Sequence, residues 1–585
     1  MPPAQGHDSN QSAAPRGAAI GVPRAILESQ VQVRPPYATL VEALEAAARD
    51  DAPLYSFHLG ASTDTRGGRA IRDGAARWAA ALSAAGVRRG DRVLVLLGAG
   101  PDFVEAFLGA MLGGFVPVPL AAPLAFGGME RHLEHLARIA ESAEPAAMIT
   151  SPRIAAALET APAFRSRVPR VLVPGDLVAL GAAHIPTPSV DASTTAFLQY
   201  TSGTTGRPKG VIVSHGAVVA NASAIATGLA IAPGDVGVSW LPPFHDMGLV
   251  GALLTTLCHP YPMNVLPPER FIMRPRAWLD TISAAGATLS AAPNFAYVLC
   301  CTKVTSTDGL RLDRWRAALD GAEPVHAETL ERFATHFADC GFRREAFLPV
   351  YGLAEQTLAV AFPALGVGYE TLCVDREELA RGRVLPRETR GATLVSVGGP
   401  VAGTTIGVRA GEDSGGELAR EDVVGEIVVR GPSCMGGYFR DEEASAAVLR
   451  DGWLHTGDLG FIHAGNLYIS GRAKELVVTS GRNVYPSDVE LVAARVPSVQ
   501  GSVAAFGRFD ARHGTEALVV AVEARTSDEE VRTRIASEVR GELLSVLGFA
   551  AEVHVVGVGT LPRTTSGKIR RRECAAWLDA RNTPT

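Results

Sequence analysis

Blocks of consecutive hydrophobic residues alternate with longer segments in which hydrophobic residues recur every three to four positions. The uninterrupted blocks at 92–97, 115–120 and 147–150 predict strands buried on both faces. The segments with helical spacing lie at 39–57, where a helix leads into a further strand, and at 70–85, 102–112 and 129–142. Strands that alternate with helices in this way favour a parallel sheet with crossover helices, and so an α/β fold class.

The chain is long enough for more than one domain. Its 585 residues and 61.2 kDa exceed what one compact core holds, so we expect two or more domains. Residues 1–36 are rich in Ala, Pro, Gly, Ser and Gln without the apolar core of a secretion signal, and they predict a disordered tail. Residues 106–129 carry no charge, but three prolines interrupt them, so we expect a buried helix and strand and no membrane span.

Charge and cysteine content exclude several classes of function. A net charge of −6 and a pI near 6.2 give no general attraction to nucleic acid or to an anionic membrane, and no basic stripe with interleaved aromatics appears. We therefore expect no nucleic-acid partner. The seven cysteines are scattered without paired metal spacing, which predicts neither a disulfide framework nor a zinc site and fits a cytoplasmic protein.

One segment, 199–211, combines glycines, hydroxyls and a lysine in the order QYTSGTTGRPKGV. Glycine lets several backbone N–H groups turn toward one anion, while hydroxyls add donors and lysine adds positive charge. The residues that would contribute are Thr201, Ser202, Gly203, Thr204, Thr205, Gly206, Lys209 and Gly210. Pro208 before the lysine and the apolar run 211–213 after it indicate a hairpin-like phosphate loop, unlike the helix that follows a P-loop. The alternative is a flexible polar turn.

This segment closely resembles the phosphate loop of the adenylate-forming superfamily, which includes acyl-CoA synthetases, nonribosomal peptide adenylation domains, luciferases and fatty acyl-AMP ligases. The resemblance covers roughly residues 39–577. It implies a large N-terminal domain, 37–471, of stacked α/β subdomains with a distorted β-barrel. It further implies a small, mobile α+β C-terminal domain, 472–585.

Segments after the loop narrow the resemblance to fatty acyl-AMP ligases. The sequence SWLPPFHDMGL at 239–249 has the His-Asp-Met-Gly form of these ligases and implies that His245 lies near the acyl pocket and the nucleotide. The alternative is a structural histidine at a strand end. The segments 274–279 and 290–297 also resemble these ligases, and we expect their aromatic side chains in the core or the pocket wall.

Further motifs resemble the nucleotide site of the superfamily. In DGAEPV, 320–325, the resemblance implies that adenine rests on Gly321 and Ala322. In VYGLAE, 350–355, it implies that Tyr351 stacks on adenine beside Gly352 and that Glu355 holds Mg²⁺ together with Thr201. A lone glutamate would more often be a solvated loop residue.

The last motifs supply ribose contacts and a lysine. The resemblance assigns Asp458 to both ribose hydroxyls, Arg472 to ribose and phosphate, Lys474 to the pivot of the small domain, and Lys568, after Ser566-Gly567, to catalysis. The alternatives are an ordinary turn at Asp458, a plain surface charge at Lys474 and a solvated basic tail at Lys568.

A longer segment than acyl-CoA ligases have separates Glu355 from Gly398. Residues 366–391 resemble the insertion that marks fatty acyl-AMP ligases, which implies a restraint on the C-terminal domain that disfavours transfer to CoA. The alternative is a surface loop without consequence.

Together these motifs predict activation of a fatty acid by ATP and Mg²⁺. A carboxylate is ionised at pH 7 and is already a nucleophile, so no general base is required. The resemblance implies an acyl-adenylate product and later transfer to the phosphopantetheine thiol of a separate holo acyl carrier protein in a polyketide or nonribosomal peptide pathway. The strings at 6–9 and 411–414 match Gly-x-Asp-Ser without the helix start of a carrier serine, so we expect no fused carrier. A long-chain fatty acyl-CoA ligase and a non-catalytic homologue are the alternatives.

Overall fold

Buried strands alternating with helices form a four-stranded parallel sheet near the start of the chain. The computed structural model of the protein describes residues 24–122, 129–159, 162–178, 189–201, 208–411, 417–479, 482–510, 515–564 and 568–582. The sheet has the order β5-β4-β6-β7, and all its pairs are parallel. Its elements are β4 (Arg92–Leu96), β5 (Val116–Pro119), β6 (Ala147–Thr150), β7 (Val171–Leu172), α2 (Gly68–Ala84), α3 (Pro101–Leu112) and α4 (Met129–Ala143). These elements confirm the predicted alternation.

A second, seven-stranded sheet has the order β14-β13-β12-β10-β11-β2-β3 and is parallel except at the β2–β3 edge. Its strands are β2 (Pro53–Leu59), β3 (Ser62–Gly67), β10 (Gly237–Ser239), β11 (Met263–Val265), β12 (Leu289–Ala292), β13 (Ala317–Asp320) and β14 (Phe347–Pro349). The helices connecting or covering them include α1 (Leu40–Ala47), α7 (His215–Gly228), π-helix η2 (Met247–Leu254), α8 (Thr255–Cys258), α9 (Pro268–Met273), α10 (Arg276–Ala285), α11 (Asn294–Lys303) and α12 (Ala327–His336). Since strands in a parallel sheet end on the same edge, β10, β12, β13 and β14 deliver their following loops to one place.

An antiparallel, curled sheet stands where the distorted barrel was predicted. It has the order β1-β20-β21-β23-β22, with β24 beside β23. Its strands are β1 (Ile26–Glu28), β20 (Thr405–Arg409), β21 (Gly425–Arg430), β22 (Leu449–Arg450), β23 (Trp453–His463) and β24 (Asn466–Arg472), and α14 (Glu442–Val448) precedes β22. Because β1 pairs with β20, the predicted disordered tail of residues 1–36 is wrong for this part, whereas residues 1–23 lie outside the described residues.

Shorter pairings complete the large domain. The predicted phosphate loop joins β8 (Thr195–Thr201) to β9 (Lys209–Ser214), which pair antiparallel as a hairpin. β15 (Tyr351–Gly352), β16 (Ala359–Phe362) and β19 (Gly399–Pro400) form a small sheet. The segment 366–391 contributes β17 (Thr371–Val374) and α13 (Arg376–Ala380), and β17 pairs with β18 (Ala392–Val395).

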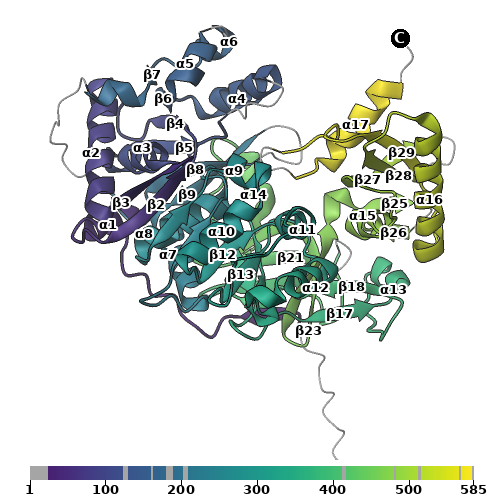
Figure 1. Cartoon of the computed structure of the whole chain (residues 1–585). Coiled ribbons are helices and arrows are strands. Elements are labelled where there is room, and N and C mark those ends of the chain that lie inside the picture. Colours follow the sequence, from purple (N-terminus) through teal and green to yellow (C-terminus); the bar gives the residue numbers. More distant parts are fainter. Residues whose placement is uncertain are drawn as a thin grey trace, which may run out of the picture.

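The C-terminal part of the chain forms a smaller α+β body with its own core, drawn in light green to yellow in Figure 1. β27 (Val503–Asp510), β28 (Thr515–Ala524) and β29 (Glu552–Gly557) form its sheet, and β25 (Val477–Thr479) pairs with β26 (Arg482–Val484). Its helices are α15 (Pro486–Ala494), α16 (Glu529–Leu547) and α17 (Arg571–Asn582). Two hydrophobic clusters, built from residues 477 onward, stabilise this body separately from the large domain.

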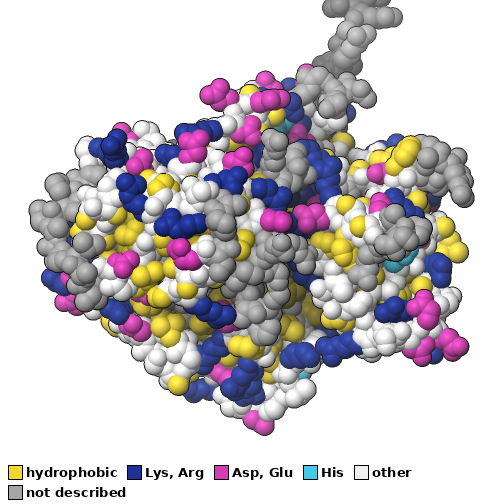
Figure 2. Space-filling model, turned by 90° about the horizontal axis from the view of Figure 1, so that it is seen from above, with side chains coloured by type: hydrophobic (Ala, Val, Ile, Leu, Met, Phe, Trp, Pro, Cys, Tyr) yellow, Lys and Arg dark blue, Asp and Glu magenta, His cyan; other side chains and the backbone are white. Residues whose placement is uncertain are grey.

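Charged side chains of both signs are mixed over the face seen in Figure 2. No described helix combines the length and the apolar character needed to cross a membrane.

Candidate active site

A cleft with a volume of about 2560 Å³ lies between the large domain and the C-terminal body. Its lining brings together ten of the predicted site residues: Thr201, Lys209, His245, Ala322, Tyr351, Gly352, Glu355, Asp458, Arg472 and Lys568. Gly321 lies immediately behind this lining, next to Ala322. Ser202, Gly203, Thr204, Thr205 and Gly206 lie outside the described residues.

Asp458 is held at both carboxylate oxygens. The β23–β24 register places it opposite Arg472, whose Nε donates to Asp458 Oδ1 at 2.7 Å. The Tyr351 hydroxyl donates to Asp458 Oδ2, also at 2.7 Å. The carboxylate is only 6% exposed, and its charge raises the pKa of Arg472. The three predicted residues thus form one hydrogen-bonded unit, in which Asp458 and Tyr351 are buried and Arg472 is exposed.

Glu355 lies at the next position around the cleft, on the 3₁₀ turn Ala354–Gln356. Its Oε1 accepts a hydrogen bond of 2.9 Å from the hydroxyl of Tyr438. The ring of Tyr438 also lies under Lys209, with Nζ 4.6 Å from the ring centroid. Burial raises the pKa of Glu355, and the Tyr438 hydrogen bond opposes that rise. The sequence analysis missed Tyr438, because no local motif marks a tyrosine that reaches a glutamate 83 positions away.

His245 is oriented by the residue that follows it. Its Nδ1 lies 2.6 Å from Asp246 Oδ1, and this oxygen also accepts from the Met247 N–H at 2.7 Å, where η2 begins. Burial on its own would raise the pKa of Asp246, but its interactions with the neighbouring His245 and Lys568 hold it below its usual range. Asp246 therefore joins the site as an anion, a role not predicted from its motif.

Lys568 is brought to this cleft by the C-terminal body. Its backbone N–H donates to Thr564 Oγ1 at 3.0 Å and its carbonyl accepts from Thr564 N at 2.7 Å, so these two bonds fix its backbone against Thr564. Burial lowers the pKa of Lys568, whereas the charge of Asp246 opposes that shift. In its cationic form, Lys568 lies in the cleft lining, where it could neutralise the charge of a bound phosphate group.

The predicted adenine loop depends on close backbone packing. A Cβ on Gly321 would lie 2.5 Å from Val350 Cγ2 and 2.8 Å from the Val350 carbonyl oxygen, so a side chain would separate the ends of β13 and β14. Ala322 has a φ of 71°, a left-handed conformation that turns the chain back toward the cleft. Glu323, which follows, accepts from the Phe295 N–H at 2.6 Å and ties this loop to the start of α11.

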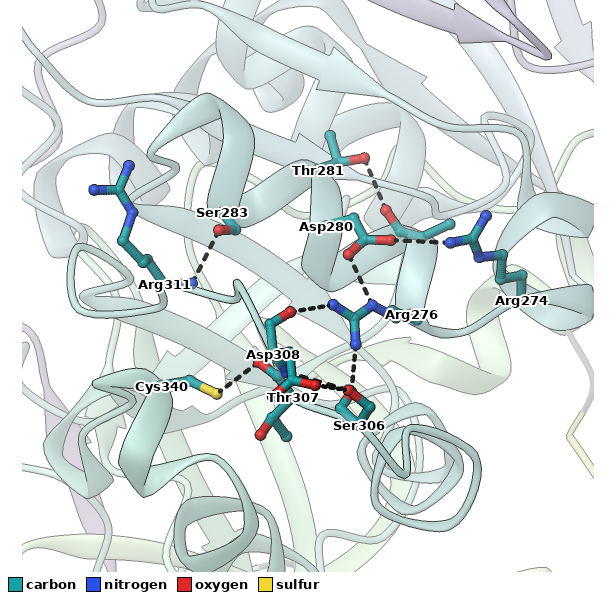
Figure 3. Close-up of polar contacts among 11 residues, drawn as sticks. Arg274, Arg276, Asp280, Thr281, Ser283, Ser306, Thr307, Asp308, Arg311 and Cys340 are labelled. Carbon is teal, nitrogen blue, oxygen red and sulfur yellow. Dashed lines mark hydrogen bonds and ion pairs between the residues drawn. The ribbon is translucent and has the colours of Figure 1, made fainter.

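The segment 274–279, which was expected to form core or pocket wall, places Ala277, Trp278 and Leu279 in the core and its arginines in polar contacts (Figure 3). Arg276 donates to Asp280 Oδ1 at 3.1 Å, to the Asp308 carbonyl at 2.6 Å and to the Ser306 carbonyl. Trp278 is fully buried and donates to Ser290 Oγ at 2.9 Å. These contacts fix α10 to the loop after α11, and they are structural.

The segment 366–391 makes several contacts with the C-terminal body. Arg376 forms two hydrogen bonds with the carboxylate of Asp488, at 2.9 and 3.2 Å. Asn483 donates to the Ala380 carbonyl at 3.0 Å, and Glu377 lies 3.2 Å from Arg482. Leu379 packs in a cluster with Tyr485. The segment therefore bridges the two bodies, as Figure 1 shows beside α13.

Comparisons with known proteins agree with this geometry. The family model described as AMP-binding enzyme matches residues 45–439, and the one described as AMP-binding enzyme C-terminal domain matches residues 481–572. A Caulobacter vibrioides protein, named provisionally as an acyl-CoA synthetase, is 35% identical over 545 residues, which cover 92% of this chain and 94% of that protein. The medium-chain fatty acid–acyl-carrier-protein ligase JamA of Moorena producens is 34% identical over 512 residues, covering 83% of this chain and 86% of JamA.

A solved structure extends the likeness to the whole fold. A chain from a study of fatty acyl-adenylate ligases of E. coli and L. pneumophila superposes with a TM-score of 0.86 at 35% identity, over 94% of this chain and 99% of that one. The chain belongs to the AMP-binding enzyme family, the adenylate-forming superfamily predicted from its motifs. It is an adenylate-forming ligase, and its relatives include fatty acid–AMP ligases.

Proposed function

We propose that the protein condenses a fatty acid with ATP to give a fatty acyl-adenylate and pyrophosphate, and then transfers the acyl group to the phosphopantetheine thiol of a separate acyl carrier protein. The observation that carries the first step is the meeting of Lys568, from the C-terminal body, with Asp458, Arg472 and Glu355 in one cleft. Relatives that are named as ligases of fatty acids support the choice of acid.

The reaction joins two anions, so its main barrier is electrostatic repulsion. One oxygen of the fatty acid carboxylate forms a bond to the α-phosphorus of ATP while the bond from that phosphorus to the bridging oxygen of pyrophosphate breaks. Lys568 and Lys209 would offset the charge on the phosphates. The hydrogen-bonded unit of Asp458, Arg472 and Tyr351 would fix the ribose and adenine, which would hold the α-phosphorus in line with the carboxylate.

The donors around Glu355 fit a magnesium ion. Mg²⁺ is held in phosphate-transfer sites by one or two carboxylates together with substrate phosphates, and Glu355 offers a carboxylate whose burial favours a nearby cation. Among the described residues no group of three or more His, Cys, Asp or Glu could hold a metal without substrate. We infer that Glu355 and Thr201 hold Mg²⁺ bound to ATP, where it would neutralise phosphate charge.

The bridging segment 366–391 supports a carrier thiol in preference to CoA as acceptor. Its bonds to Asp488 and Asn483 oppose the rotation of the C-terminal body that transfer to CoA would need. The relative JamA, which is named as a ligase of medium-chain fatty acids and acyl carrier protein, also supports a carrier thiol as the acceptor. An acyl-CoA ligase is the second candidate, favoured by the name of the Caulobacter relative. All seven cysteines are unpaired, which supports a cytoplasmic site of action.

The two candidates can be separated by their products. The purified protein is incubated with a mixture of fatty acids, ATP and Mg²⁺, and then with either CoA or a phosphopantetheinylated carrier protein, and products are identified by mass spectrometry. We expect acyl-AMP without an acceptor and acyl-carrier with the carrier. Abundant acyl-CoA would overturn the choice of acceptor, and absence of acyl-AMP together with absence of pyrophosphate–ATP exchange would overturn the first step and favour a non-catalytic homologue.

A further inference from the structure

Strand β23 carries a bulge where it pairs with β21. Glu426 of β21 pairs with Leu459, and the next regular pair joins Val428 to His455. Between these two pairs, one residue of β21, Ile427, matches three residues of β23: Thr456, Gly457 and Asp458. Bulges bend a strand and re-aim its side chains, and they are common next to active sites. The bulge therefore determines the direction in which the Asp458 carboxylate points.

Side chains bind the backbone groups that the bulge removes from the regular strand pairing. The hydroxyl of Thr456 donates to the Ile427 carbonyl at 2.7 Å and accepts from the Asp458 N–H at 3.1 Å. The N–H of Gly457 donates to Oε1 of Glu426 at 3.0 Å. An N–H group that is kept from water without an acceptor costs free energy, so these three bonds stabilise the bulge in one conformation.

Both carboxylate oxygens of Glu426 are used within the protein. Its Oε2 lies 2.7 Å from Nδ1 of His455, the last regularly paired residue before the bulge. An ionised carboxylate only accepts hydrogen bonds, so Nδ1 carries the proton in this pair. The His455 side chain is only 4% exposed, and it fixes Oε2 while Oε1 accepts from Gly457. His455 therefore orients the carboxylate that binds the bulge.

Gly457 gives the bulge its sharp turn. Its φ is 71°, in the left-handed region that favours glycine. A Cβ built on this glycine meets nothing within 4 Å. Alanine at this position therefore strains the backbone of the bulge without a steric clash. It alters the same feature as a change at Glu426, by an independent route.

The bulge brings the carboxylate of Asp458 to the cleft. Tyr351 and Arg472 donate to its two oxygens. The backbone that carries this side chain is fixed by the bulge, through the bond from Gly457 to Glu426. We propose that Glu426 is a positioning residue for the nucleotide, which places the Asp458 carboxylate against the ribose hydroxyls of ATP by accepting from the Gly457 N–H. The inference rests on the proposed function, in which Asp458 binds ribose, and adds to it a residue that acts through Asp458.

The test measures acyl-AMP formation by the full chain and compares KM for ATP with KM for the fatty acid that the unaltered protein adenylates fastest. In Glu426→Ala we expect KM for ATP to rise about tenfold, because the Gly457 N–H loses its acceptor. We expect KM for the fatty acid to change less than about twofold. Glu331→Ala is the matched control, since Glu331 also accepts two hydrogen bonds, from Tyr369 at 2.6 Å and from Arg344 at 2.8 Å, and lies outside the described lining of the cleft. Its KM for ATP should equal that of the unaltered protein.

A double-mutant cycle separates positioning from a general structural role. Asp458→Ala removes the carboxylate, so Glu426→Ala added to it should change kcat/KM for ATP by less than about twofold. Two independent losses would multiply instead. Glu426→Gln keeps an oxygen that accepts from the Gly457 N–H, and we expect this variant to restore KM for ATP to within about threefold of the unaltered value.

The outcomes separate this inference from the function on which it rests. If the unaltered protein forms no acyl-AMP, the proposed function fails and the inference falls with it. If Asp458→Ala lowers kcat/KM for ATP but Glu426→Ala behaves as Glu331→Ala does, or if the two losses multiply, the inference alone is overturned. If Glu426→Ala fails to fold, Gly457→Ala decides: it should raise KM for ATP and lose this effect beside Asp458→Ala, and an unchanged KM for ATP would overturn the inference.

Discussion

Asp246 favours the cationic form of Lys568 inside the cleft. Burial lowers the pKa of this lysine, and the neighbouring carboxylate opposes that shift. The charge that the reaction needs is therefore favoured by a partner on the other domain. At the scale of single residues, the site works by placing each charged group opposite one that stabilises its ionised form.

Replacing Lys568 by alanine removes the cation that the C-terminal body contributes. We expect adenylation to fall by about a hundredfold to a thousandfold, which corresponds to a loss of roughly 3 to 4 kcal/mol of transition-state stabilisation. Pyrophosphate release measures the effect, and circular dichroism checks that the protein stays folded. Lys303→Ala, at the exposed end of α11, serves as the control, and equal rates in the two variants would contradict the role of Lys568.

Replacing Tyr438 by phenylalanine tests the hydroxyl that holds Glu355. The hydrogen bond to Oε1 favours the ionised carboxylate, so its removal raises the pKa of Glu355 further. Because the charged form would bind Mg²⁺, we expect the acidic limb of the pH profile of kcat/KM to move to higher pH, while the Phe ring keeps its contact with Lys209.

Tyr369→Phe provides a matched control, since Tyr369 donates an equivalent hydrogen bond of 2.6 Å to Glu331 away from the cleft. Its pH profile should not move. A Tyr438→Phe profile that coincides with this control would show that the hydroxyl does not tune Glu355.

The sequence predicted the site residues that belong to motifs. It did not predict residues that contact the site from distant positions in the chain. Asp458, Arg472 and Tyr351 were each predicted singly, but their mutual hydrogen bonds arise from the β23–β24 register and from the end of β14. Tyr438 had no motif to mark it. Residues 202–207 of the phosphate loop lie outside the described residues, so the contacts with phosphate predicted for five of them stay predictions.

At the scale of elements, the bridging segment 366–391 holds the C-terminal body against the large domain through specific hydrogen bonds. Asp375 caps the start of helix α13, because its side chain accepts from Glu378 N at 3.0 Å. Arg376 and Ala380 of this helix then contact the C-terminal body. The extra length was visible in the sequence. The sequence did not show that Asp488 and Asn483 are the partners of this segment, because no local pattern links positions more than a hundred residues apart.

Replacing Arg376 by alanine weakens this bridge. The pair with Asp488 is less than one third exposed at both side chains, and its loss should favour rotation of the C-terminal body by about 1 kcal/mol, or about fivefold in population. We expect acyl-CoA formation to rise by a similar factor, while acyl-AMP formation changes less than twofold. Both products are measured by mass spectrometry in one reaction.

Arg344→Ala is the control, because Arg344 pairs with Glu331 at 2.8 Å within the large domain. Acyl-CoA levels that respond equally to both substitutions would show that the bridge does not govern the choice of acceptor.

At the scale of the whole molecule, two bodies with separate cores share one reaction site. The hydrophobic clusters of the C-terminal body contain no residue of the large domain, and the cleft lies between them. Hydrophobic periodicity predicted the alternation of strands and helices up to residue 150, and the resemblance to the adenylate-forming superfamily implied the stacked subdomains and the α+β end. Neither could predict the relative placement of the two bodies, which depends on polar contacts such as Arg376 with Asp488.

Separate cores predict separate unfolding. We expect differential scanning calorimetry to resolve two transitions, the smaller belonging to the C-terminal body. A nonhydrolysable acyl-adenylate analogue, which contacts both bodies, should raise both midpoints, and Lys568→Ala should reduce the rise of the smaller one. A single transition whose calorimetric and van't Hoff enthalpies agree would contradict this division.

Both carboxylate oxygens of Asp458 accept a hydrogen bond from the protein, and this affects how well the site distinguishes ribose from deoxyribose. Tyr351 and Arg472 each already donate to this carboxylate, so a nucleotide that lacks its 2′-hydroxyl leaves no acceptor in the cleft unpartnered. Enzymes reject a deoxy analogue strongly when the missing hydroxyl leaves a buried polar group of the site without a hydrogen-bond partner. We therefore expect dATP to replace ATP with a loss of less than about tenfold in kcat/KM, measured by acyl-AMP formation from either nucleotide.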